Sequence, residues 1–158
     1  MRKKSTLMAA LVVAVLLCAC NQAKRMVEFP LVGTANTTSI VIERVERTDT
    51  ATLLTVRGFN YPGYWIRISP DTRIVAEGKE YRLKGSKDII IGERLSMPED
   101  GDSCFTLISE LLPMSCQSFD YIEGYAEGDW RLYDIDLTGK TGEEYPASLP
   151  RGLKKIPN

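Results

Sequence analysis

The sequence contains no histidine. Histidine is the commonest general base near neutral pH and the commonest metal ligand, so its absence removes the usual catalytic and metal-binding arrangements. The chain also lacks an excess of either charge, because 20 Lys and Arg residues balance 21 Asp and Glu residues among its 158. A balanced chain of this length indicates one domain without a long-range field that would draw it to nucleic acid. We therefore expect no nucleic-acid partner.

The N-terminal residues indicate export. Residues 2–4 are a positive n-region, and residues 7–17 form an apolar run of h-region length that is too short to span a bilayer. Residues 17–20 then resemble the lipobox of bacterial lipoproteins, in which a small residue precedes the acylated cysteine. Cys20 follows Ala and fits this pattern, whereas Cys18 follows Leu. The resemblance implies a signal peptide over 1–19 and lipidation of Cys20; an ordinary signal peptide with a nearby free cysteine is the alternative.

Acylation would tether the body to a membrane. A single acyl chain, at roughly 0.8 kcal/mol per buried CH₂, gives only marginal anchoring, whereas bacterial lipoproteins resemble the multiply acylated case. We assign residues 20–34 to the lipidated N-terminus and its tether. Asn21 is not the aspartate associated with inner-membrane retention, and residues 24–25 lack the acidic run associated with surface export. We expect an outer-membrane anchor that faces the periplasm, with surface exposure left open.

The body of the chain is predicted to consist of short antiparallel strands. Runs rich in β-branched and aromatic residues alternate with turn residues, and no helical period is present. Residues 48–50 and 77–80 fit the turns of two hairpins. This pattern is typical of an antiparallel sandwich or barrel, and we favour an immunoglobulin-like β-sandwich over residues 35–138. An irregular tail with several Pro and Gly residues would follow over 139–158.

The stretch 103–137 has the clearest strand pattern. It predicts strands at 105–108, 119–122 and 130–137. In the last of these, strict alternation would place Leu132 and Asp134 on one face and Tyr133 and Ile135 on the other.

Three segments of the body resemble a known module. Residues 60–68, 75–81 and 119–124 are similar to parts of the β-sandwich domain that precedes thioredoxin-like domains in exported Bacteroides-type disulfide reductases. The resemblance covers about residues 35–138 and implies a β-sandwich in an exported setting. No thioredoxin domain and no Cys-x-x-Cys motif follows, so reductase activity is not implied.

An aromatic cluster follows the first hairpin. Tyr61, Tyr64 and Trp65 surround a Pro-Gly bend, and aromatic side chains of this kind can stack on sugars or anchor a protein partner. Strand alternation places Tyr64 and Trp65 on opposite faces, and a buried tryptophan is common in sandwiches. We predict that Trp65 belongs to the core and that Tyr61 and Tyr64 are the candidate ligand or partner contacts.

Cys104 and Cys116 are the only cysteines left in the exported, lipidated chain. An oxidising compartment favours a structural disulfide between them, provided that their Cα atoms come within ~7 Å. Two separate thiols are the alternative.

Acidic residues near the C-terminus have a spacing that partly resembles a calcium loop. The candidates are Asp134, Asp136, Gly139, Glu143 and Glu144. Their spacing fails the calcium pattern because Tyr145 stands where a carboxylate is needed. Residues 98–102 fit a polar turn better than an ion site. We therefore expect no metal, no cofactor and no catalytic residue.

Three functions are compatible with these observations. The first is a membrane-anchored, non-catalytic binding or adaptor module with an envelope protein as partner. The second is a glycan-binding lipoprotein, and the third is a small carboxylate-dependent envelope enzyme. Coplanar exposed aromatic rings would favour a glycan, an open edge or apolar patch would favour a protein, and acidic residues in one deep pocket would favour the enzyme.

Overall fold

The computed structural model describes residues 23–142, and this part of the chain consists of strands and connections without a helix. Within these residues no helix is long and apolar enough to cross a membrane. All neighbouring strands run antiparallel, which confirms the predicted all-β antiparallel class. The strands are β1 (Met26–Glu28), β2 (Thr34–Ala35), β3 (Ile40–Arg47), β4 (Thr52–Phe59), β5 (Trp65–Ile66), β6 (Arg73–Ala76), β7 (Lys79–Lys87), β8 (Leu95–Ser96), β9 (Asp102–Ser109), β10 (Ser118–Ile122) and β11 (Arg131–Asp136).

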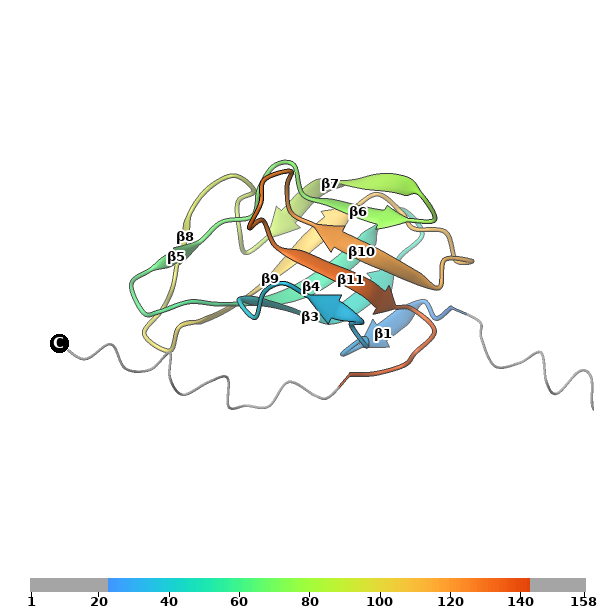
Figure 1. The fold of residues 1–158 in the computed structure, drawn as a ribbon, viewed down its shortest axis with the longest axis horizontal. Coiled ribbons are helices and arrows are strands. Elements are labelled where there is room, and N and C mark those ends of the chain that lie inside the picture. The colour runs from blue at the N-terminus through green and yellow to red at the C-terminus, as the bar shows by residue number, and fades with distance from the viewer. Residues whose placement is uncertain (1–22, 143–158) are drawn as a thin grey trace, which may run out of the picture.

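Nine strands form one sheet that curls into a half-barrel (Figure 1), in the order β1-β3-β4-β9-β7-β6-β10-β11-β2. β5 and β8 form a separate two-stranded sheet. The long strand β7 joins the two halves, because residues 79–82 pair with β6 and residues 83–87 pair with β9. The register shifts between Leu83 and Gly85, and such a bulge bends a strand and increases its twist. The expected immunoglobulin-like sandwich has two separate sheets, whereas this ladder runs continuously from one half to the other.

Two of the connections are the predicted hairpins. Between β3 and β4, the Thr48 N–H donates to the carbonyl oxygen of Ala51 at 2.9 Å, and the Thr48 hydroxyl oxygen accepts from the Ala51 N–H at 3.0 Å. Between β6 and β7, Glu77 and Gly78 both have positive φ, of 52° and 75°. A two-residue type I′ turn requires this conformation at both positions. Both hairpin predictions are confirmed.

The three strands predicted within residues 103–137 are confirmed as β9, β10 and β11, but the strict alternation predicted for the last one is wrong. A bulge interrupts the β10–β11 ladder: Phe119 pairs with Ile135 and Tyr121 with Leu132. Asp134 takes the left-handed conformation there, with a φ of 54°. The extra residue returns Ile135 to the face of Leu132, so both side chains are buried.

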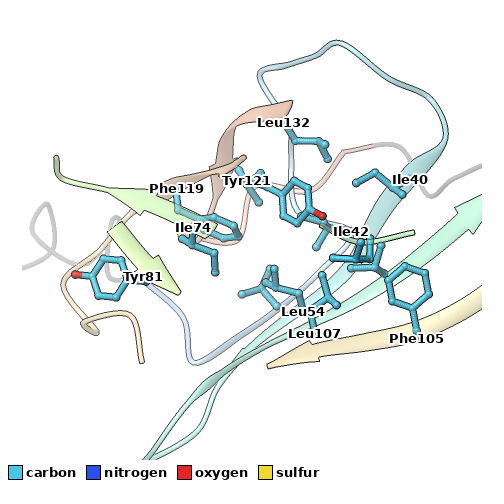
Figure 2. Close-up of a cluster of buried hydrophobic side chains, with 14 of the residues drawn as sticks. Ile40, Ile42, Leu54, Ile74, Tyr81, Phe105, Leu107, Phe119, Tyr121 and Leu132 are labelled. Carbon is cyan, nitrogen blue, oxygen red and sulfur yellow. The ribbon is translucent and has the colours of Figure 1, made fainter. Parts of the chain in front are cut away.

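The core fills the space between the two halves of the curled sheet (Figure 2). Ile42, Leu54 and Leu107 reach it from β3, β4 and β9, and Phe119 and Tyr121 reach it from β10; all are at most 2% exposed. Burying such a side chain contributes about 1.5–3 kcal/mol. Packing of these apolar side chains therefore holds the two halves of the curled sheet together.

Both ends of the described chain join this body. β1 pairs with β3 at one edge of the sheet and β2 with β11 at the other, so residues assigned to the tether by sequence take part in the sheet. Pro30 forms an isolated bridge with Thr141, and the Gly142 N–H donates to the carbonyl oxygen of Phe29 at 2.9 Å. The start of the predicted irregular tail thus packs against the residues that follow β1.

Candidate functional site

The β5–β8 sheet projects from one end of the half-barrel, beyond the end of β4 (Figure 1). A turn over residues 61–64 leads into β5. The Tyr64 N–H donates to the carbonyl oxygen of Tyr61 at 3.0 Å, and Gly63 has a φ of 78°. Pro at the second position of a turn and Gly at the third fit a type II turn. The sequence Tyr61-Pro62-Gly63-Tyr64 therefore fixes how the two tyrosines are presented.

Hydrogen bonds from Asn60 hold this turn in place. Its side-chain Nδ2 donates to the carbonyl oxygen of Trp65 at 2.8 Å, and its Oδ1 accepts the Tyr61 N–H at 2.8 Å. The Tyr64 carbonyl oxygen accepts the Met97 N–H at 2.8 Å, which ties the turn to the end of β8. Ile66 points into the core below, where it is 2% exposed. The projecting sheet is thus braced by polar contacts at its surface and by apolar packing underneath.

Trp65 lies on the surface, so the prediction that it belongs to the core is wrong. Its side chain is 44% exposed and that of Tyr64 is 52% exposed, whereas Ile66 and Ile68 are buried. β5 has only two residues and pairs only with β8, where Trp65 stands opposite Ser96. Among residues 23–142, no second layer covers this small sheet on the side of Trp65, and the isoleucines take the inward positions. We call Tyr61, Tyr64, Trp65 and Arg94 the aromatic surface.

The members of the aromatic surface contact one another. The ring centroids of Tyr61 and Tyr64 are 5.7 Å apart and their planes are tilted by 58°. The guanidinium carbon of Arg94 lies 4.2 Å from the centroid of the Trp65 ring, in a cation–π contact. The structure therefore brings the two predicted contact residues together and adds a tryptophan and an arginine. No sequence pattern marked Arg94, because β8 is too short to show a period.

The predicted disulfide is not formed in this structure, where Cys104 and Cys116 are free thiols. Cys104 is exposed on β9, five residues before Ser109, which is ~17 Å along a strand. Cys116 is buried after that end of β9, and its Sγ contacts the carbonyl oxygen of Ser118 at 3.0 Å. The connection of residues 110–117 does not fold back over the length of β9, which is why the two thiols do not meet. Burial, followed for Cys104 by the charge of Glu43, raises the pKa of both thiols.

Asp136, one of the acidic residues of the rejected calcium loop, has a structural role. Asp136 Oδ1 accepts the backbone N–H groups of Thr138, Gly139 and Lys140 at 2.9–3.0 Å, so this carboxylate caps a turn. Residues 98–102 form the predicted polar turn, in which the Gly101 N–H donates to the Pro98 carbonyl oxygen. Glu143 and Glu144 lie outside the described residues, as does Cys20. No group of three or more Cys, Asp or Glu side chains within residues 23–142 is placed to hold a metal ion.

Glu123 is a buried carboxylate that holds two loops together. Its Oε1 accepts the Ser69 N–H at 3.3 Å and its Oε2 accepts the Trp130 N–H at 3.2 Å. Burial raises the pKa of Glu123, while these two N–H donors oppose the increase. Both carboxylate oxygens are thus engaged with the backbone, which explains the buried position without a catalytic role.

A cavity of about 330 Å³ lies where the residues after β1 cross the open seam of the half-barrel. Its wall is mostly apolar and includes Leu31, Ile40, Ile42 and Leu132. None of the described residues that line it is acidic. This cavity gives no support to a mechanism that depends on a pair of carboxylates.

The aromatic surface is therefore the best-supported candidate site on the described part of the chain. Comparison with known proteins found no family model, no curated protein and no solved structure that matches the chain.

Proposed function

We propose that this protein is a lipid-anchored, non-catalytic adaptor of the bacterial envelope that binds another envelope protein through the aromatic surface. The observation that carries the proposal is the exposure of Tyr64 and Trp65 together on a braced projection. Trp, Tyr and Arg are the residues most enriched at the energetic centres of protein interfaces. A monomer gains little from exposing a tryptophan that its own core could bury, so a partner is the simplest explanation of the arrangement.

The shape of the aromatic surface favours a protein over a glycan. Sugar rings stack best on a flat row of aromatic faces, whereas the Tyr61 and Tyr64 rings are tilted by 58°. Arg94 also occupies one face of the Trp65 ring. An uneven patch that mixes aromatic rings with a guanidinium suits the side chains of a protein interface. Glycan binding is the alternative that the experiment below tests.

The sequence supports the location, through the n-region, the apolar run and the Ala19–Cys20 junction. We propose that Cys20 carries the lipid and that the body faces the periplasm from the outer membrane. The relationship to the immunoglobulin-like sandwich domain of exported disulfide reductases is likewise a proposal, supported by the three motif segments and by the all-β antiparallel fold.

The test is co-purification of the lipidated full-length protein from detergent-solubilised membranes, with Trp65→Ala and Tyr125→Ala as a matched pair. Tyr125 is a suitable control because it is 69% exposed and Arg73 lies over its ring at 4.1 Å, which reproduces the Trp65–Arg94 contact elsewhere. We expect a specific partner that is retained by wild type and Tyr125→Ala and lost by Trp65→Ala.

Two results would contradict the proposal. One is an identical set of co-purified proteins for all three forms. The other is binding of purified envelope polysaccharide that Trp65→Ala abolishes and Tyr125→Ala preserves, which would assign the aromatic surface to a glycan.

A further inference from the structure

A buried arginine holds the N-terminal end of the described chain against the half-barrel. Arg47, at the end of β3, is fully buried, and its Nη1 donates to the carbonyl oxygens of Pro113 at 2.9 Å and Cys116 at 3.1 Å. Its Nη2 donates to the carbonyl oxygen of Lys24, and its backbone N–H donates to that of Arg25 at 2.7 Å. Burial lowers the pKa of Arg47. The side chain and the backbone N–H of Arg47 together therefore fix residues 24–25 against the connection between β9 and β10.

The tether before this clamp is short. Four residue steps separate Cys20 from Lys24, and a fully extended chain covers at most about 14 Å in that distance. The headgroup layer of one leaflet is roughly 5–8 Å thick. If the acyl chains of Cys20 are in the hydrocarbon, most of this reach is used to cross the headgroup layer. The clamped end of the body then stays within about one headgroup-layer thickness of the membrane surface.

The connection that Arg47 clamps presents apolar side chains to the outside. Leu112 is buried and its N–H donates to the Thr52 hydroxyl oxygen at 2.9 Å, and Cys116 is buried with its N–H donating to the Pro113 carbonyl oxygen at 3.0 Å. Side chains on either side of the buried Leu112 face solvent: Leu111 is 38% exposed and Met114 is 45% exposed. Apolar side chains that project from a braced loop can enter the boundary between headgroups and acyl chains.

Charges at this end are balanced. Lys24 and Arg25 are exposed, but Arg25 pairs with Asp49 at 2.8 Å, and Glu77 and Glu110 are also exposed there. Electrostatic attraction to anionic lipid thus adds little. The contact depends on the short tether and on the apolar side chains.

We infer that this end of the half-barrel rests on the lipid bilayer, with Leu111 and Met114 in the headgroup region and the aromatic surface facing away from the membrane. The inference rests on the proposed acylation of Cys20. The connection between β9 and β10, which Arg47 clamps, and the β5–β8 sheet lie at opposite ends of the long axis (Figure 1). Along β4, Thr52 pairs with Arg47 at the clamped end and Gly58 lies next to Ile66 of β5, and the six steps between them span ~20 Å. The aromatic surface is thereby held out toward a partner in the aqueous compartment.

The test uses the lipidated full-length protein in vesicles of phosphatidylethanolamine and phosphatidylglycerol. Cys104→Ser removes the exposed thiol, and Met114→Cys or Tyr64→Cys then carries an environment-sensitive fluorophore. The two positions are similarly exposed and lie at opposite ends of the body. At position 114 we expect a blue shift of the emission and quenching of the fluorescence by brominated acyl chains. At position 64 we expect neither effect.

Flotation of the same samples separates the possible failures. If the protein floats with the vesicles but the probe at 114 shows the same emission and the same lack of quenching as the probe at 64, the inference is overturned and the anchor remains intact. Quenching at both positions would show a body lying flat on the membrane, which also overturns it. Protein that does not float at all would refute the proposed acylation and this inference with it.

Discussion

Trp65 is exposed and its neighbour Ile66 is buried, so truncating each to alanine should change the free energy of unfolding by different amounts. Trp65→Ala removes a ring that is 44% exposed, whose described cation–π contact is with Arg94. Such a contact at an exposed site is worth about 0.5–1 kcal/mol. Ile66→Ala removes a smaller side chain that is 2% exposed and packs next to Gly58 and Phe105. Truncating a buried isoleucine to alanine costs about 2–5 kcal/mol, because it leaves a cavity as well as losing burial.

The larger residue should therefore be the less important one for stability. Against a total of ~5–15 kcal/mol for a domain, Ile66→Ala should be severe, whereas Trp65→Ala should cost less because nearly half of its side chain is already in contact with solvent. Urea denaturation followed by far-UV circular dichroism measures both free energies of unfolding. In Trp65→Ala the remaining tryptophan is Trp130, which is half-buried and packs against the core, so its fluorescence gives an independent signal for that variant.

A loss of stability in Trp65→Ala equal to or greater than that in Ile66→Ala would refute this reasoning. It would place Trp65 in the core and remove the main support for the aromatic surface. The proposed adaptor function predicts the reverse order for binding. Trp65→Ala should lose the partner while it keeps its fold.

Three further predictions concern buried groups. The Tyr121 hydroxyl is buried with only a weak contact to Thr72, so Tyr121→Phe should keep or raise the free energy of unfolding at pH 7 by up to about 1 kcal/mol. Burial raises the pKa of Tyr121, so the unfolded chain deprotonates first and wild type should lose stability above pH ~10; a Tyr121→Phe variant with the same alkaline loss would contradict this. Alkylation of never-reduced native protein should modify Cys104 alone, and Cys116 should react only after unfolding. Recovery of a disulfide-linked peptide pair would instead show that the two cysteines are bridged. Arg47→Ala should lower the free energy of unfolding by ~2–5 kcal/mol in urea titrations, because three carbonyl oxygens lose their donor, and full stability in Arg47→Met would show that volume alone matters there.

Local patterns in the sequence were enough for the long strands and the two hairpins of the body. Residues 52–58 of β4 alternate between buried and half-buried, as a period of two requires. The turns at residues 48–51 and 77–78 depend on hydrogen bonds and backbone conformations within a few residues, so their sequences predict them. The all-β antiparallel class follows from these local features.

Curling of the sheet was decided by register, which the sequence does not display. The shift between Leu83 and Gly85 lets β7 serve both halves, and the bulge at Asp134 returns Ile135 to the core. One extra residue in a strand reverses the faces of all that follow. A pattern of strict alternation therefore places the side chains after each bulge on the wrong face.

The candidate site depended still more on tertiary structure. A large aromatic residue is expected inside, but whether Trp65 has a layer to pack against depends on where a two-residue strand finds its partner. Arg47 is buried because Lys24, Pro113 and Cys116 bring their carbonyl oxygens to it from distant parts of the chain. The sequence by itself determined the long strands and the two hairpins, because these depend on neighbours along the chain. Only the tertiary structure decided the curl of the sheet, the separation of Cys104 from Cys116 and the exposure of the aromatic surface, because these depend on contacts between residues that are far apart in sequence.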